Sequence, residues 1–285
     1  RQWVEWFFRS MFEEPCLAFA YTQAGQENSF TWGSIEKGLN IQIPLLANRF
    51  RKGEIRVETL TRSGEWFREN FPVTPPTAVT ALTDYREKDR KTVWYNSRYY
   101  RTNLLWEGGA LCIRDIHMFD QRMESDYYRK AGPANQCVYA TLRVVDGCMW
   151  STREQLAGLR VVRRNADGSL AQAHGGTPAV TEKSKGKLLV EWPMDDGRKL
   201  TILLSEEGME IAVSGKGPDW MLELTAAPGA ALPFTAFGAR RIAAVQKGFA
   251  YAFDCTKGTI ATDGTSTGSI FVLHPSDGKI SLKFK

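Results

Sequence analysis

The chain has little of what most directly identifies an active site. Its 285 residues include only three His and five Cys, and the Cys are widely spaced, with no Cys-x-x-Cys pair. A disulfide framework and a zinc knuckle are therefore not expected. No Gly-x-Gly-x-x-Gly, phosphate-binding Gly-Lys-Ser/Thr or His-Glu-x-x-His motif is present. We accordingly expect no cofactor and no metal ion.

Long apolar runs and an excess of one charge are also missing. No hydrophobic stretch approaches the length of about 20 residues that spans a membrane. The net charge is only +5, and Lys and Arg are interspersed with Asp and Glu rather than gathered in a basic stripe. We therefore expect neither a membrane nor a nucleic acid as a partner. A hydrophobic content of 43% is typical of a globular protein.

Aromatic residues, in contrast, are abundant. The chain has nine Trp and nine Tyr. Aromatic side chains with a polar group suit flat, partly hydrated ligands such as sugars, although they also fill cores and interfaces.

Residues 1–75 read as alternating helices and strands. One helix covers residues 1–14, with Trp3, Phe7 and Met11 on one stripe, and two more begin near Ser34 and Ser63. The predicted strands are the apolar runs "CLAFAYTQ" and "EIRVETL" between these helices. Such alternation predicts parallel pairing. Two strands do not complete a parallel sheet, so we expect the preceding part of a (β/α) barrel to lie upstream of this chain.

From residue 76 to residue 285 the pattern changes to short strands separated by turns. Asp-Gly pairs recur, as at Asp146-Gly147, Asp167-Gly168 and Asp196-Gly197, and this pair supplies the positive φ that tight hairpins require. Many evenly spaced strands predict a mainly antiparallel β-sandwich. The expected fold is therefore mixed, with C-terminal units of a (β/α) barrel at 1–75 and a sandwich domain at 76–285.

The sandwich is expected to begin with a hairpin at residues 92–120. If Gly108-Gly109 is its two-residue turn, residues whose numbers sum to 217 face each other. Tyr100 then pairs with His117, and Arg98 with Phe119. Each face of this hairpin has an apolar part near the turn and a polar part farther away.

The polar part of the hairpin predicts a site of about the size of a sugar. A carboxylate beside an imidazole can share proton transfer, so Asp115 and His117 are candidate catalytic residues. Arginine can hold an anionic or hydroxyl-rich group. The candidate substrate-binding residues of this hairpin are Trp94, Arg98, Tyr100 and Arg114. The alternative is a polar network between domains, because buried polar groups must be paired whatever the function.

Two further candidate carboxylates lie in the barrel-like region. Glu27 follows the first predicted strand and Glu58 lies at the end of the second. Ligands gather beyond the C-terminal ends of parallel strands, and glycoside hydrolysis uses paired carboxylates. Trp32, which follows the same loop as Glu27, is a candidate for stacking on a sugar ring. The alternative for both carboxylates is a helix-start charge or a solvated loop.

The stretches "CLAFAYTQAGQENSFTWGSIEKGL" and "IRVETLTRSGEWFREN" resemble the closing βα units of a polysaccharide-active barrel. "VWYNSRYYRTNLLWEGGALCIRDIHMFD" and the strands after it resemble the β-sandwich that follows such a barrel. The arrangement is similar to bacterial glycoside hydrolase and deacetylase-type barrel proteins. The resemblance implies a polysaccharide-degrading hydrolase and a secreted or periplasmic location, and it supplies no catalytic residue.

Three functions are compatible with these patterns. The first is the C-terminal portion of a glycoside hydrolase that acts on an oligosaccharide or polysaccharide. The second is a non-catalytic glycan-binding module, in which Trp32, Trp94 and Trp106 stack on sugars. The third is a structural pair of domains whose aromatic residues all lie in the core. The oligomeric state is left open by the sequence.

Overall fold

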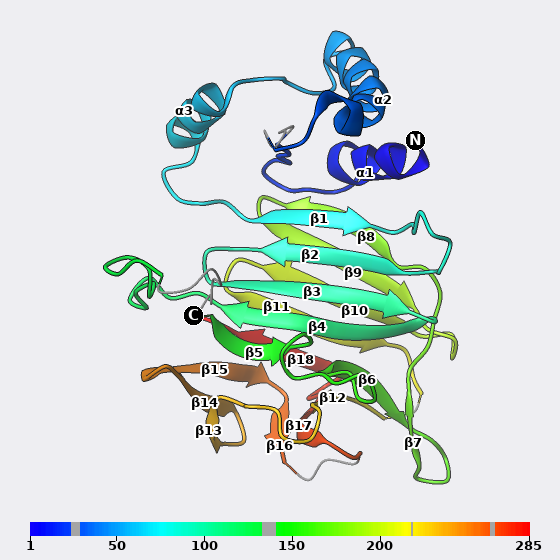
Figure 1. Ribbon diagram of the computed structural model, residues 1–285. Coiled ribbons are helices and arrows are strands. Elements are labelled where there is room, and N and C mark those ends of the chain that lie inside the picture. Colours follow the sequence, from blue (N-terminus) through cyan, green and yellow to red (C-terminus); the bar gives the residue numbers. More distant parts are fainter. Residues whose placement is uncertain (24–28, 133–140, 218, 263–265) are drawn as a thin grey trace.

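The computed structural model describes residues 1–23, 29–132, 141–217, 219–262 and 266–285. Within them the chain forms two antiparallel sheets and three helices (Figure 1). The central path of the ten-stranded sheet runs β1 (Thr77–Ala81), β2 (Lys91–Asn96), β3 (Tyr100–Glu107), β4 (Ala110–Met118), β6 (Gly158–Arg164), β12 (Trp220–Thr225), β17 (Ser269–His274), β16 (Thr259–Ala261). β5 (Leu142–Asp146) pairs with β4, and β7 (Leu170–Gln172) pairs with β6.

The second sheet has eight strands. Its order is β13 (Phe234–Phe237), β14 (Arg241–Gln246), β15 (Phe249–Lys257), β18 (Lys279–Lys283), β11 (Gly208–Ser214), β10 (Lys199–Ser205), β9 (Lys187–Pro193), β8 (Ala179–Ser184). Figure 1 shows β8 to β11 behind β1 to β4. The antiparallel sandwich expected after residue 76 is thus observed, and the exact domain division at residue 75 stays a prediction.

The prediction that residues 1–75 form part of a (β/α) barrel is wrong. The resemblance to barrel hydrolases is therefore wrong as well. Every strand pairing between the described residues is antiparallel. The run Cys16–Gln23 contributes a single bridge from Leu17 to Thr77, and residues 54–59 form no strand. Short apolar runs become strands only beside a partner strand, and the sequence alone does not show whether one is present.

The three helices are present as predicted, with slightly different starts. They are α1 (Gln2–Phe12), α2 (Trp32–Arg51) and α3 (Leu60–Asn70). α2 is preceded by Thr31 rather than Ser34, and α3 by Thr59 rather than Ser63. The Thr59 hydroxyl accepts a hydrogen bond from the Arg62 amide at 3.3 Å, which caps α3. α1 contributes Val4 and Phe8 to buried positions, whereas neither α2 nor α3 has a buried residue.

The core lies between the two sheets and is rich in aromatic residues. Tyr95, Tyr100 and Trp106 point inward from β2 and β3, and each is at most 1% exposed. The Tyr100 hydroxyl crosses to the second sheet and donates to the Gly208 carbonyl at 2.9 Å. The Tyr100 ring also lies 4.6 Å from that of Phe284. Tyr100 is therefore a core residue and not a candidate for binding substrate.

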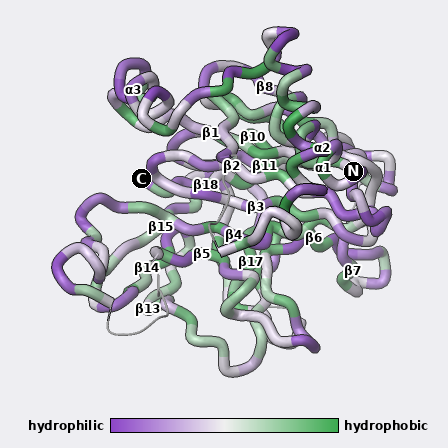
Figure 2. Tube along the Cα trace, turned by 45° about the horizontal axis from the view of Figure 1, so that its top comes forward, coloured by the Kyte–Doolittle hydropathy of each residue, from purple (hydrophilic) through white to green (hydrophobic). Residues whose placement is uncertain are grey.

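A short strap joins the N-terminal region to the edges of both sheets. The Ala78 amide donates to the Cys16 carbonyl, and Thr80 donates to the Pro15 carbonyl. The Cys16 and Leu17 amides both donate to one oxygen of Glu182 on β8, at 3.0 and 2.9 Å. α1 lies beside β1 and β8, and α2 and α3 lie farther out (Figure 1). Hydrophobic and hydrophilic residues are mixed along these helices (Figure 2).

Within the residues that the structure describes, we found no helix that combines the length and the apolar character needed to cross a bilayer.

Candidate functional site

A β-bulge at Arg114 sets the register of the predicted hairpin. Gly108 and Gly109 form its turn with φ of +58° and +75°, as expected. Near the turn the paired residue numbers sum to 217, but the register shifts between Asn103 and Leu104, and from there Asn103 pairs with Asp115. The extra residue of β4 is Arg114, which is exposed. The predicted pairing of Tyr100 with His117 is therefore wrong, and Tyr100 pairs with Met118 instead.

The shifted register aligns two rows of side chains on the outer face of the ten-stranded sheet. One row runs Val79, Trp94, Asn103, Asp115, Asp146 across β1 to β5. The neighbouring row runs Thr77, Asn96, Arg101, His117, Arg143. Because residues two apart on a strand share a face, the two rows lie side by side.

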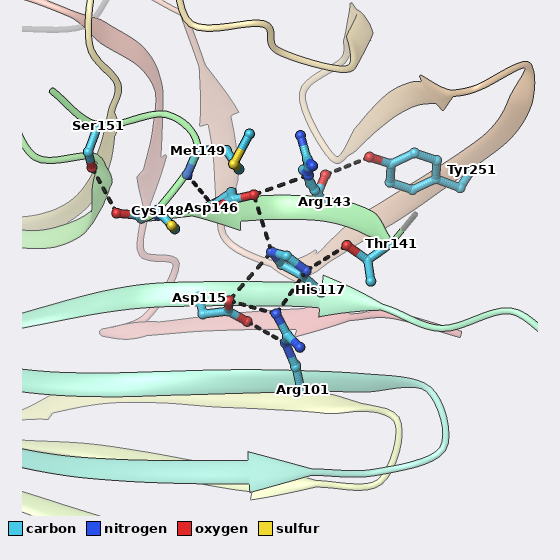
Figure 3. Close-up of polar contacts among 11 residues, drawn as sticks. Arg101, Asp115, His117, Thr141, Arg143, Asp146, Cys148, Met149, Ser151 and Tyr251 are labelled. Atoms are coloured by element: carbon cyan, nitrogen blue, oxygen red, sulfur yellow. Dashed lines mark hydrogen bonds and ion pairs between the residues drawn. The ribbon is translucent and has the colours of Figure 1, made fainter. Parts of the chain in front are cut away.

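The centre of these rows is a network of ionic side chains that we call the His117 cluster (Figure 3). Its members are Arg101, Asp115, His117, Thr141, Arg143 and Asp146. The Arg101 guanidinium binds both oxygens of Asp115, at 3.0 and 3.1 Å. Two parallel bonds of this kind fix the orientation of both groups.

His117 lies between two carboxylates and is 5% exposed. Its Nδ1 is 3.2 Å from an Arg101 nitrogen and 2.8 Å from the Thr141 hydroxyl. An arginine nitrogen can only donate, so the neutral ring accepts at Nδ1 and carries its hydrogen on Nε2. Nε2 faces Asp115 at 3.5 Å and Asp146 at 3.7 Å, and it makes no hydrogen bond to any described residue.

Burial keeps His117 neutral. Loss of hydration lowers the pKa of His117 below its ordinary value of 6.5, and Arg101 and Arg143 lower the pKa further, whereas Asp115 and Asp146 oppose them. Desolvation is the largest cause, because a charged imidazole loses more hydration on burial than a neutral one. The cluster thus holds a neutral imidazole among two carboxylates and two guanidinium groups.

Asp146 is fixed from both sides. Its Oδ1 accepts from the amides of Cys148 and Met149, at 3.0 and 2.8 Å. Its Oδ2 lies 3.1 Å from Nε of Arg143. Tyr251 on β15 donates to the Arg143 carbonyl at 2.6 Å, which ties β5 to the second sheet. The sequence assigns Asp146 to a turn with Gly147, and the structure gives it a second role in the cluster.

The structure brings some of the predicted residues together. Asp115, His117 and Trp94 share the outer face, and the Arg101 guanidinium lies 5.9 Å from the centre of the Trp94 ring. Arg114 is next to Asp115 in the chain but lies in the bulge and is exposed.

The other predicted residues lie elsewhere. Arg98 belongs to the β2–β3 turn, where it forms an ion pair with Glu206 at 2.9 Å. Glu58 precedes α3 and accepts from Ser63 at 3.3 Å. Trp32 begins α2 and is 59% exposed, and Glu27 lies outside the described residues. Glu58 and Trp32 therefore do not lie at the ends of parallel strands, where they were predicted.

Four members of the cluster were not predicted, namely Arg101, Thr141, Arg143 and Asp146. Arg101 could have been found only by allowing a bulge in β4, because the regular register places it opposite Ile116. β5 shifts in register as well, between Ile116 and His117, so Arg143 and Asp146 reach the same face of the sheet although they are three residues apart.

The described residues contain no group of three or more His, Cys, Asp or Glu suited to a metal ion. Within the cluster, Arg101 and Arg143 provide the positive charge opposite the carboxylates.

Comparisons of the chain with models of protein families, with curated proteins and with solved structures found no match.

Proposed function

We propose that this chain is a carbohydrate-active protein that acts on an oligosaccharide or polysaccharide through the His117 cluster. The observation that supports this most is the state of His117. His117 is a buried imidazole that stays in its neutral, base form, with Nδ1 as the acceptor and the Nε2 hydrogen directed toward Asp115 and Asp146. Histidines whose pKa is shifted by burial and by specific charged neighbours are concentrated at functional sites.

Proton transfer is the chemistry that suits this arrangement. The Thr141 hydroxyl is hydrogen-bonded to Nδ1 and is half-buried, so it can relay a proton from water or a sugar hydroxyl to the ring. The resulting imidazolium would carry the new hydrogen on Nδ1, so this step breaks the hydrogen bond from Arg101 to Nδ1 and requires that guanidinium nitrogen to move away. The Nε2 hydrogen would stay directed at Asp115 and Asp146, whose negative charges stabilise the imidazolium. His117 is thus proposed as the general base.

Substrate recognition is assigned to the neighbouring part of the outer face. Trp94 is half-buried, and Arg101 is one of its neighbours on β3. An indole ring can stack on the apolar face of a sugar, while a guanidinium donates to hydroxyl or anionic groups. Arg101 is 34% exposed in its side chain, so it can contact solvent and the cluster at once.

A non-catalytic glycan-binding module is the second candidate. The observation that favours it is the contact between Arg101 and Trp94, which alone would provide a binding surface on a flat sheet. In that case the buried ionic groups position Arg101 and take no part in proton transfer.

The test is a screen of the full chain against neutral and acidic polysaccharides, with binding measured by calorimetry and products by reducing ends. His117→Gln should lower turnover by about 10²- to 10⁴-fold, the usual contribution of a general base, with the Kd for the polysaccharide nearly unchanged. Trp94→Ala should weaken binding instead. His174→Gln is the matched control, because His174 is exposed and lies outside the cluster.

Binding that depends on Trp94 and Arg101 without any product would support the second candidate. If no glycan binds, or if His117→Gln and His174→Gln behave alike in turnover, the catalytic proposal is wrong.

A further inference from the structure

A cavity of about 450 Å³ lies at one end of the sandwich, away from the His117 cluster. Strand ends and turns from both sheets form it, including the ends of β6, β11 and β17 and the starts of β10 and β12. Its polar and aromatic lining residues are Arg164, Arg198, Asp219, Trp220 and His274. This size suits one small organic molecule.

Arg198 forms a rigid wall of this cavity. It is 7% exposed, and its Nε and one terminal nitrogen both bind Oδ2 of Asp196, at 3.0 and 2.8 Å. The same oxygen lies 3.7 Å from Arg163. Asp196 thus holds the Arg198 side chain in place and also lies near Arg163.

Two glycines allow the loop after β11 to lie directly on Arg198. A Cβ at Gly217 would come within 2.8 Å of Cδ and Nε of Arg198. Gly215 has a φ of +89°, a conformation that favours glycine. The loop and Asp196 hold the Arg198 side chain from two directions, so the cavity wall is built before any ligand enters.

Arg164 supplies a cationic group at this cavity. Its guanidinium donates to the Gly168 carbonyl at 3.3 Å and forms no ion pair with a carboxylate of the described residues. Lys216 lies between Gly215 and Gly217 and is exposed. It likewise forms no ion pair with a carboxylate of the described residues. Asp219 is the one carboxylate among the lining residues. Arg164 and Lys216 thus give the cavity more positive than negative charge, and Asp219 is the one lining carboxylate that can accept a hydrogen bond.

We infer that this cavity binds a hydroxylated organic anion, a carboxylate that also carries hydroxyl groups. Arg164 would bind the carboxylate, and the positive charge of the nearby Lys216 would favour its entry. Asp219 would accept from a hydroxyl group of the ligand, which a simple inorganic anion lacks. The inference is independent of the proposed role of the His117 cluster.

The test is calorimetric titration of the full chain with glucuronate, with sulfate and with glucose as separate probes. Glucuronate should bind more tightly than either of the others, because only glucuronate offers both kinds of group. Arg164→Gln should weaken glucuronate binding by about tenfold or more, the effect of losing one charge-assisted hydrogen bond. Arg153→Gln is the matched control, since Arg153 is an exposed arginine that lies outside the cavity lining.

Arg164 is itself exposed, so the variant should fold, and circular dichroism checks that it does. Absence of saturable glucuronate binding by the wild type would overturn the inference. So would equal weakening in Arg164→Gln and Arg153→Gln. Sulfate binding as tight as that of glucuronate would replace the assigned ligand class by a simple anion. Glucuronate binding that is weakened by Arg164→Gln belongs to this cavity, whereas binding that is weakened by Trp94→Ala belongs to the surface beside the His117 cluster, so the two proposals can fail separately.

Discussion

Arg101 determines how His117 is protonated. Because the guanidinium can only donate, its contact with Nδ1 selects the tautomer that carries hydrogen on Nε2. Thr141 reinforces this choice through its hydroxyl at 2.8 Å. The chemistry of the cluster therefore depends on a residue on β3 and a residue that precedes β5, both of which contact a histidine on β4.

The depressed pKa of His117 predicts a loss of stability in acid. The unfolded chain binds a proton at this residue near pH 6.5, whereas the folded chain does so only at lower pH. The unfolded state thus takes up more protons between these two values, and the free energy of unfolding must fall as the pH drops below about 6.5. Chemical denaturation at several pH values between about 7.5 and 5 measures this fall.

His117→Gln should reduce the fall, because glutamine does not titrate. His174→Gln serves as the control for replacing an exposed histidine outside the cluster by glutamine. Identical pH profiles for the wild type and His117→Gln would contradict the buried neutral state assigned to this residue.

At the scale of single elements, the bulge in β4 places the cluster on one face. Leu111 and Ile113 point inward before the bulge, and Ile116 and Met118 point inward after it. The inward-facing residues therefore have odd numbers before the bulge and even numbers after it. This change leaves the odd-numbered Asp115 and His117 on the outer face. The Arg114 carbonyl accepts from the Gly147 amide at 2.8 Å, which connects the bulge to the turn after β5.

The bulge predicts different outcomes for two single-residue deletions. Deleting Arg114 removes the extra residue and keeps every neighbouring side chain on its present face. The expected result is a folded protein that is less stable by about 1–2 kcal/mol, mainly through the lost bond to Gly147. Deleting Cys112 leaves the extra residue in place. Regular pairing would then direct the Arg114 side chain into the core and Ile113 out of it.

The Cys112 deletion should accordingly show no cooperative unfolding transition, whereas the Arg114 deletion should show one. Urea denaturation followed by Trp fluorescence distinguishes the two. Similar stabilities for both deletions would mean that the register of β4 is not fixed by its side-chain pattern.

The sequence was sufficient to predict the turn of this hairpin but not its full register. Two adjacent glycines identify Gly108-Gly109, because both positions need positive φ. The bulge has no comparable local signal in the sequence. Arg114 is not a residue type that is typical of bulges, and it becomes the extra residue of β4 only because of how β4 pairs with β3 and β5. Asp115 and His117 could therefore be identified as site candidates, whereas Arg98 and Tyr100 were wrongly placed beside them.

At the scale of the whole molecule, the strands were easier to predict than the way they assemble. Short strands separated by Asp-Gly turns indicated the antiparallel sandwich. The apolar stripe at residues 1–14 and the starts near Ser34 and Ser63 indicated the three helices. The runs at residues 16–23 and 54–60 were wrongly predicted to be strands. Hydrophobicity indicates that a segment is buried, but it does not show which segment packs beside it. Leu17 packs against the sandwich core, whereas Val57 is 63% exposed.

The strap at Cys16 and Leu17 is where the N-terminal region meets both sheets, and one carboxylate is central to it. Glu182 on edge strand β8 accepts from both strap amides. Bonds to an ionised acceptor are stronger than neutral ones, so Glu182→Ala should raise hydrogen exchange at the two amides about tenfold or more. Glu210→Ala is the control, because Glu210 pairs with Lys279 in the same sheet. Mass spectrometry of exchanged peptides should find the buried strands β3 and β10 unchanged in both variants. Equal exchange at residues 16 and 17 in the two variants would mean that the contacts with β1 hold the strap without Glu182.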